Sequence, residues 1–299
     1  MSLVSLVRIR KNTTIAMKNA IIESLDHIGY SFEDNIENVV IKPNLCYYWD
    51  ASTGQTTDPR FMAALIDVIR EKTSSKTISI VESDASAMRC KQAFRFLGYE
   101  KLASDYGVEL INLSEESYNT TSVKVGTESF SIMVPKIIQD ADLKINVSKI
   151  KYAMEQIKLT CALKNIYGCN PMPKKFKYHS KLGEAIVAMN KAMKFDLCLV
   201  DGNTVSGIQP RRIGLVMASK DPVAIDVAAA EIASINPKAV KYLRLASNEG
   251  LGSTSYIPKG VPLKQFKDFY PRKTLKKKLM SKAYSFAIQT GLDKKLGLH

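Results

Sequence analysis

The sequence lacks the patterns that mark membrane-spanning and exported proteins. Its 299 residues contain no run of about 18 apolar residues, which argues against a transmembrane helix. The N-terminus has no apolar segment followed by small residues at a cleavage site, which argues against secretion. We therefore expect a cytoplasmic protein.

Cysteine is scarce and scattered. The five cysteines form no C-x-x-C pair and are odd in number, which is typical of free thiols in a reducing cytoplasm. The close spacing of ferredoxin cysteines is absent, so no iron–sulfur cluster is expected in this chain. The alternative is a cluster held by the distant Cys46, Cys161 and Cys169. Cys198 lies in an apolar strand pattern, where a core position is expected.

Nucleotide-binding fingerprints are also missing. Neither G-x-G-x-x-G nor G-x-x-x-x-G-K-[ST] occurs, so neither a dinucleotide site nor a P-loop is supported. With 45% hydrophobic and 24% charged residues, the composition is that of a soluble globular protein. The length allows one large α/β domain over 1–268, or two lobes over about 1–120 and 121–268.

Positive charge is abundant and points to an anionic partner. The net charge is +14, and the segment between Asp268 and Asp293 holds six basic residues without an acidic one. In this tail, 269–299, apolar residues recur at helical spacing and predict a basic amphipathic helix over 272–288. Such a helix can bind an anionic membrane surface, a partner groove or the protein's own surface. Nucleic acid is less favoured, because aromatic residues do not alternate with the basic clusters.

Strand and helix patterns alternate along the chain. This alternation predicts a Rossmann-like α/β fold with a mostly parallel sheet. Around Gly126-Thr127 two short alternating segments instead predict a small β-hairpin insertion over 122–134. Strands are expected at 6–9, 38–41, 77–81, 108–113, 142–147, 196–200 and 213–218, and helices at 15–28, 61–69, 88–105, 181–194, 223–233 and 239–247.

Polar side chains follow several of these strands. Because open α/β sheets bind ligands beyond the carboxyl ends of their strands, Lys42 and Asn44 are candidate ligand-binding residues. Lys149 and Lys151 follow another strand and share one side of it. Asp201 follows a third strand.

The segment Thr56–Arg60 reads as the start of a helix. Thr57 or Asp58 can cap this helix, with Pro59 in its first turn. The free N–H groups there, together with Arg60, can also meet an anion. The alternative is a capped helix without a ligand.

The stretch Leu159–Cys169 places Lys164 and Asn165 at the end of an apolar helical pattern, just before Gly168. A basic segment then leads to His179. An amphipathic helix with a glycine cap and a solvated loop would give the same pattern. In the functional interpretation, neighbouring cations lower the pKa of Lys164, which lets it act as a nucleophile or base.

These positions define the candidate site. We assign a catalytic role to Lys164, Asn165, Asp201 and His179, and substrate binding to Lys42, Asn44, Thr57, Asp58, Arg60, Lys149 and Lys151. Asp226 lies about one helical turn beyond Asp221, and this pair is a candidate Mg²⁺ site.

Short motifs lie at 41–45, 56–60, 142–151, 162–168, 201–202, 219–226 and 250–252. Together, in that order, they resemble the family called domain of unknown function 362. That resemblance implies a Rossmann-like α/β protein, often encoded with iron–sulfur ferredoxin modules, and hence a ferredoxin-like partner. The chain itself contains no such module. It also has Lys151-Tyr152-Ala153 where the family commonly has Lys-Thr-His.

Three functions remain open from the sequence. The first is an enzyme acting on a small anionic substrate that carries phosphate or carboxylate. The second is a redox component, based on the family's ferredoxin partners and on Cys161 and Cys169. The third is a binding module for a membrane surface or nucleic acid, based on the net charge.

Overall fold

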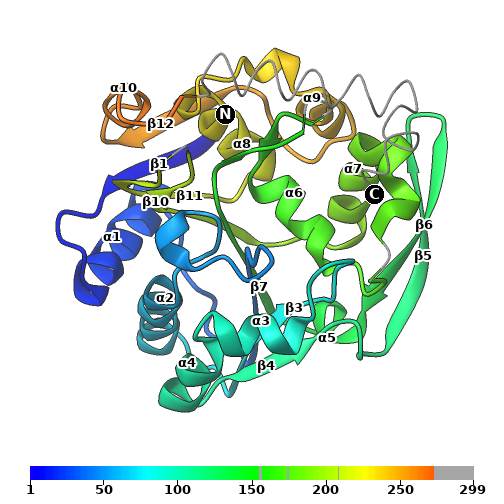
Figure 1. The fold of residues 1–299 in the computed structure, drawn as a ribbon, viewed down its shortest axis with the longest axis horizontal. Coiled ribbons are helices and arrows are strands. Elements are labelled where there is room, and N and C mark those ends of the chain that lie inside the picture. Colours follow the sequence, from blue (N-terminus) through cyan, green and yellow to red (C-terminus); the bar gives the residue numbers. More distant parts are fainter. Residues whose placement is uncertain (155–156, 174, 208, 273–299) are drawn as a thin grey trace.

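The computed structural model describes residues 1–154, 157–173, 175–207 and 209–272, except the side chains of 176, 177 and 179. The predicted catalytic side chain of His179 and nearly all of the predicted 272–288 helix lie outside this part. Figure 1 shows a central sheet with helices on both faces.

Eight strands form the central sheet. Five of the seven neighbouring pairs are parallel, and only β11 runs against its neighbours, which confirms the predicted, mostly parallel α/β sheet. In spatial order the strands are β12 (Tyr256–Gly260), β1 (Ser2–Arg8), β11 (Arg211–Ser219), β10 (Leu197–Val205), β7 (Leu143–Ser148), β2 (Asn38–Pro43), β3 (Thr77–Glu82) and β4 (Glu109–Asn112).

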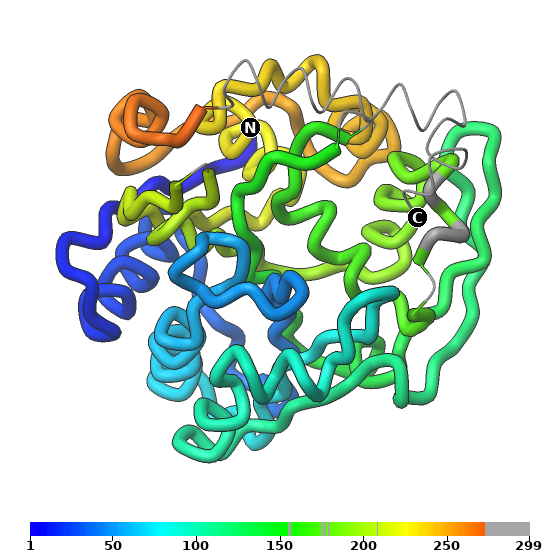
Figure 2. The backbone as a smooth tube through the Cα atoms, viewed as in Figure 1, coloured from blue at the N-terminus to red at the C-terminus, as the bar shows by residue number. Residues whose placement is uncertain are grey.

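At one edge of this sheet the strands do not follow each other in the order of the sequence. Strand β1 does not pair with β2 but lies between β11 and β12, so the two ends of the described chain meet, as Figure 2 shows. Strand β10 continues to Val205 and strand β11 begins at Arg211, so both are longer than the strands expected over 196–200 and 213–218. The two strands form an antiparallel hairpin, and its ladder of hydrogen bonds orders residues that look loop-like in the sequence.

The helices divide between the two faces of the sheet. On one face lie α1 (Thr14–His27), α2 (Pro59–Lys72), α3 (Cys90–Phe96) and α4 (Tyr99–Tyr106). On the other face lie α6 (Ala162–Ile166), α7 (Leu182–Ala192), α8 (Pro222–Ile232) and α9 (Lys241–Asn248). The short helices are α5 (Lys136–Gln139), α10 (Lys264–Lys267), η1 (Ala51–Thr53), η2 (Tyr167–Cys169), η3 (Lys175–Lys181) and η4 (Pro237–Ala239).

Two hydrophobic cores result, one on each face. Along β2, Val39 and Ile41 belong to the core under α1 and α2, whereas Val40 belongs to the core under α6 to α9. This is the period-two alternation of a strand that is buried on both faces. The helix expected over 88–105 is interrupted at Gly98, whose φ of 80° suits glycine and ends α3 before α4 begins.

The predicted hairpin insertion is confirmed. Strands β5 (Tyr118–Val125) and β6 (Glu128–Pro135) pair antiparallel, and Gly126 at the turn has a φ of 58°. Figure 1 shows the hairpin beside α7, and its buried side chains join the core on that face. A second, very short pair, β8 (Lys151–Tyr152) and β9 (Leu159–Thr160), leads into α6.

Candidate functional site

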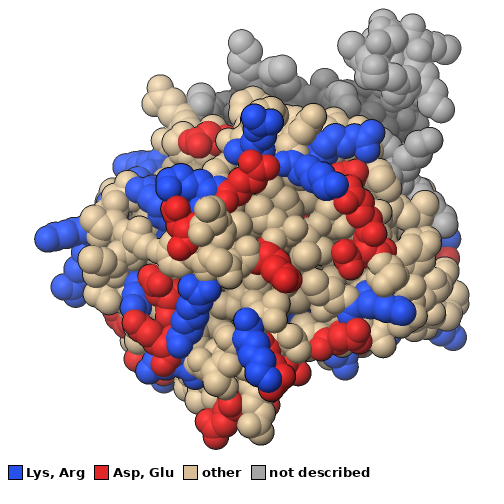
Figure 3. Space-filling model, turned by 90° about the horizontal axis from the view of Figure 1, so that it is seen from below, with Lys and Arg blue, Asp and Glu red and all other residues tan. Residues whose placement is uncertain are grey.

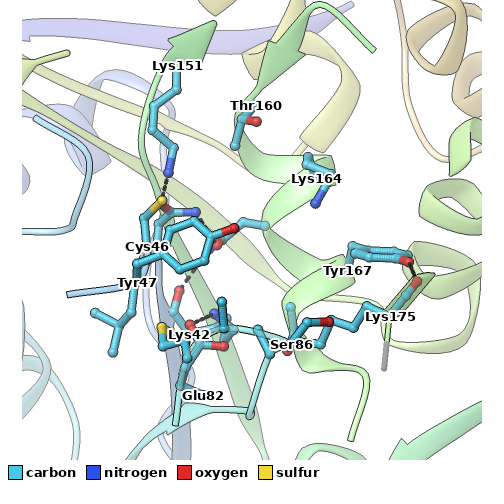
Figure 4. Close-up of a pocket in the computed structure, with 17 residues that line it drawn as sticks. Lys42, Cys46, Tyr47, Glu82, Ser86, Lys151, Thr160, Lys164, Tyr167 and Lys175 are labelled. Carbon is cyan, nitrogen blue, oxygen red and sulfur yellow. Dashed lines mark hydrogen bonds and ion pairs between the residues drawn. The ribbon is translucent and has the colours of Figure 1, made fainter. Parts of the chain in front are cut away.

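A cleft of about 330 Å³ lies at the carboxyl ends of β2 and β3, against α6. Figure 4 shows side chains from these segments around it. Strands β2, β3 and β7 are mutually parallel, so the residues that follow them meet at one edge of the sheet. The polar residues that line the cleft are Lys42, Asn44, Cys46, Tyr47, Glu82, Ser86, Lys151, Thr160, Lys164, Asn165, Tyr167 and Lys175.

Lys42 is neutralised within the protein. Its Nζ lies 2.8 Å from Oε2 of Glu82, and both side chains are almost fully buried. The same Nζ also donates a hydrogen bond to the carbonyl oxygen of Pro43. Gly168 packs against this pair, because a Cβ there would lie 3.3 Å from the Lys42 Nζ. Glu82 is not among the predicted site residues. Its position at the end of a buried strand is the same criterion by which Lys42 was predicted, so this criterion could have found it.

Amide side chains connect β2, β7 and α6 below the cleft. Lys151 Nζ donates to Oδ1 of Asn44 at 2.6 Å and to the carbonyl of Gln55 at 3.0 Å. Asn44 Nδ2 donates to Oδ1 of Asn165, whose own Nδ2 donates to Oδ1 of Asn146. Burial lowers the pKa of Lys151, and the charges of other lysines lower it further. These bonds hold the last turn of α6 against the ends of β2 and β7.

Lys164 differs from the other lysines of the cleft. Within the described part of the chain its Nζ forms no hydrogen bond or ion pair, and it lies 4.5 Å from the centroid of the Tyr167 ring. Burial, followed by the charges of Lys175 and Lys151, lowers the pKa of Lys164 to about 7. The neutral form of this side chain is therefore readily accessible near pH 7.

Lys175 closes the cleft from the loop after α6. Its Nζ donates to Oγ of Ser83 at 2.6 Å and to the carbonyl of Gly168 at 3.2 Å. Burial lowers the pKa of Lys175, which the Glu82 charge partly offsets. Lys175 is absent from the predicted site residues, because the sequence shows only a basic segment and does not reveal which of its lysines turns inward.

Lys149 and Asp201 form a separate buried ion pair. Their Nζ and Oδ2 atoms are 3.0 Å apart, and both side chains are almost fully buried. Asp201 also accepts hydrogen bonds from the backbone N–H groups of Asp58 and Asn203. Neither member of the pair is among the described residues that line the cleft.

The start of α2 adjoins that ion pair. Asp58 caps the helix by accepting from the N–H of Arg60, with Pro59 at the first turn, which confirms the predicted cap. Asp58 also holds the Arg60 guanidinium at 2.6 Å. Thr57 accepts from the N–H of Asn44 and donates to the carbonyl of Val147. The structure thus places Thr57, Asp58 and Arg60 together with Asp201, outside the cleft lining.

The predicted Mg²⁺ ligands have separate protein partners. Asp221 caps α8 and also accepts from the N–H of Ser253. Asp226 accepts from the N–H groups of Ala162 and Leu163 at the start of α6, and burial raises its pKa to about 7. In the described ranges no group of three or more His, Cys, Asp or Glu side chains is placed to hold a metal ion. The Mg²⁺ site stays a prediction.

The cysteines are dispersed. Cys46 lines the cleft, whereas Cys161 and Cys169 are fully buried in the core around α6. Cys198 is buried in β10, as its apolar surroundings in the sequence predict.

Surface charge is mixed on the face that Figure 3 shows. Lys and Arg alternate with Asp and Glu there, so the net positive charge is not gathered into one patch on that face. Among the described helices, none is long and apolar enough to cross a membrane.

The fold and the cleft define a mixed α/β protein with a lysine-rich cleft at one sheet edge. A family model described as "Domain of unknown function (DUF362)" matches residues 39–231, more than half of the chain, and the chain belongs to this family. The match begins in β2 and ends in α8, so it covers every strand and helix that lines the cleft.

Two known proteins are similar to the chain. The thylakoid-associated protein sll1697 of Synechocystis sp. is 26% identical over 255 residues, which cover 81% of this chain and 76% of that protein. The lactate racemase apoprotein of Thermoanaerobacterium thermosaccharolyticum superposes with a TM-score of 0.47 at 11% identity. That superposition covers 79% of this chain and 58% of the racemase chain, and such partial overlap carries no chemistry from one protein to the other.

Proposed function

We propose that the protein is an enzyme that binds a small anion, bearing carboxylate or phosphate, in the cleft and reacts with it through Lys164. The observation that carries the proposal is an excess of positive charge in the cleft. Four lysines line it, and Glu82 is the one carboxylate among the described lining residues, where it is already paired with Lys42. Lys151, Lys164 and Lys175 are left to attract an anion.

The chemistry proposed for Lys164 follows from its surroundings. A neutral amine is a nucleophile and a base, whereas an ammonium group is neither. With a pKa of about 7, Lys164 has its neutral form available at neutral pH, and no hydrogen bond to another described residue occupies its lone pair. Lys151 and Lys175 are anchored by protein acceptors and supply the charge that orients the substrate.

Reductive labelling with glyoxylate, a small carboxylate-bearing aldehyde, tests both parts of this proposal. Its carbonyl carbon bonds to the neutral Lys164 amine, water leaves, and added cyanoborohydride reduces the resulting imine to a stable amine. At pH 7 we expect Lys164 to be labelled at least about tenfold faster than the exposed lysines, because its neutral fraction is so much larger. The labelling rate of Lys164 should reach half its maximum near pH 7. It should fall when excess sulfate is added, because sulfate competes for the anion site. Peptide mapping by mass spectrometry gives the rates.

Two variants serve as controls. Lys164→Met should remove the fast labelling and keep the fold, because no described partner loses a hydrogen bond. Lys101→Met changes an exposed lysine in the first turn of α4, outside the described cleft lining, and should leave the fast labelling intact. Equal labelling of all lysines would reject the reactive amine, and fast labelling that sulfate does not slow would reject the anion site.

Association with an anionic membrane surface is a second candidate function. The name of the thylakoid-associated relative and the six basic residues between Asp268 and Asp293 favour it. We expect the full chain to sediment with vesicles containing phosphatidylglycerol at low salt but not with phosphatidylcholine alone. Replacing Lys276, Lys277 and Lys278 by glutamine should weaken that binding by roughly 1 kcal/mol per residue. Vesicle binding that ignores both salt and these substitutions would contradict this assignment.

A further inference from the structure

Tyr47 stands at the cleft in an unusual backbone conformation. It is the second residue of a turn that a hydrogen bond from the Trp49 N–H to the Cys46 carbonyl closes. Its φ is +51°, and that of Tyr48 is not positive. Turns with positive φ only at this position favour glycine, so a bulky tyrosine here is strained. Such strain tends to persist where a functional site needs the side chain.

Packing within the protein does not explain why a tyrosine occupies this strained position. Its side chain is 50% exposed, and among the described residues it forms no hydrogen bond or ring contact. Its neighbour Tyr48, in contrast, donates to Gln92 and lies against the ring of Phe96. Tyr47 therefore leaves a ring face available at the cleft that it lines.

The cleft lining combines two chemically different kinds of surface. Leu45, Tyr47 and Met88 contribute apolar or aromatic surface, whereas Lys151 and Lys164 contribute positive charge. Figure 4 shows Cys46 and Tyr47 on one side of the view and Lys164 and Tyr167 on the other. Lys164 Nζ lies 4.5 Å from the centroid of the Tyr167 ring and covers that ring, so Tyr47 offers the available aromatic surface of the described lining.

We propose that Tyr47 stacks on a planar ring of the ligand, so that the substrate class is an aromatic or heteroaromatic ring bearing a carboxylate or phosphate. The lysines hold the anionic group, and Tyr47 selects for the ring next to it. Aromatic pairs prefer offset or edge-to-face geometry and add affinity beyond burial. The inference rests on the anion-binding function proposed above and deepens it.

The test compares two probes of equal charge, phenyl phosphate and methyl phosphate. Their affinities for the full chain can be followed by calorimetry and by the fluorescence of Trp49, the single tryptophan, which lies two residues from Tyr47. We expect phenyl phosphate to bind about 3- to 10-fold more tightly, the range typical of an aromatic pair. Tyr47→Phe should keep this preference and Tyr47→Gly should lose it, while methyl phosphate binds all three proteins equally.

Thermal stability separates a ligand-binding role from a structural one. Glycine accepts the positive φ, and this relief offsets the extra conformational entropy that glycine loses on folding, so Tyr47→Gly should unfold at about the same temperature as the wild type. A lower midpoint would mean that the ring supports the fold, and it would overturn the inference. Methyl phosphate binding without a preference for phenyl phosphate would reject the ring-bearing substrate and leave the anion site standing. If neither probe binds, the proposed anion site is rejected as well.

Discussion

Replacing Asp201 by asparagine should lower the free energy of unfolding by about 3–5 kcal/mol, the usual result of removing one partner of a buried ion pair. Lys149 would keep its charge, almost fully buried, with no carboxylate to neutralise it and with neutral acceptors such as the carbonyl of Thr204. The backbone N–H groups of Asp58 and Asn203 donate to different oxygens of Asp201, so one of them would keep a weaker amide acceptor and the other would face the amide nitrogen, which cannot accept. The start of α2 should loosen with them.

Urea unfolding of the wild type and Asp201→Asn measures this difference. The double variant Lys149→Met/Asp201→Leu should recover much of the lost stability, because it removes both buried charges and keeps apolar volume. Asp105→Asn is a matched control in an exposed pair with Lys101 and should change stability little. A loss in Asp201→Asn no larger than in Asp105→Asn would show that this pair does not stabilise the fold.

Asp226 should make stability fall as the pH rises. Burial raises the pKa of this carboxyl from 3.8 to about 7, so between these values the folded protein keeps a proton that the unfolded chain has released. The contribution of Asp226 to the free energy of unfolding is therefore fully present below about pH 4 and is lost as the pH rises through 7. Between pH 5 and pH 8 the loss should be about 3 kcal/mol, since each pKa unit corresponds to about 1.4 kcal/mol.

The measurement compares the wild type with Asp226→Asn by urea unfolding at pH 5 and pH 8. Asparagine does not ionise, so the variant should not lose this stability. The free energy of unfolding of the variant relative to the wild type should therefore rise by about 3 kcal/mol from pH 5 to pH 8. Asp105→Asn, at an exposed position, should follow the wild type at both. A difference between the wild type and Asp226→Asn that does not change with pH would mean that Asp226 is already ionised at pH 5 in the folded protein.

Asp226 also connects the core to the proposed reactive lysine. Its carboxyl oxygens accept from the first N–H groups of α6, the helix that carries Lys164 and Asn165, and its own helix α8 packs in the same core. Helix α6 has no side-chain cap from its own N-cap residue, Cys161. The position of Lys164 in the cleft is therefore set partly by a residue 62 positions further along the chain.

Local patterns in the sequence were enough to predict most elements and the edge where the cleft lies. Apolar alternation identifies β2, β3 and β7, and polar residues directly after such strands must meet at one sheet edge once the strands are parallel. Lys42, Asn44, Lys151, Lys164 and Asn165, all predicted, do line one cleft.

Which charged side chains pair with one another depends on distances between residues that are far apart in the sequence, and local sequence patterns do not contain these distances. The sequence offers many lysines and aspartates near strand ends, and only packing decides that Asp201 neutralises Lys149, that Glu82 neutralises Lys42 and that Lys164 keeps no ionic partner among the described residues. The place of β1 beside β11 and β12 is decided in the same way. The sequence alone determined the α/β class, the family and the strand ends where the cleft lies, because these follow from periodicity and residue order. The tertiary structure decided which charges are cancelled and which remain for a ligand, because pairing between distant residues depends on their separation in space.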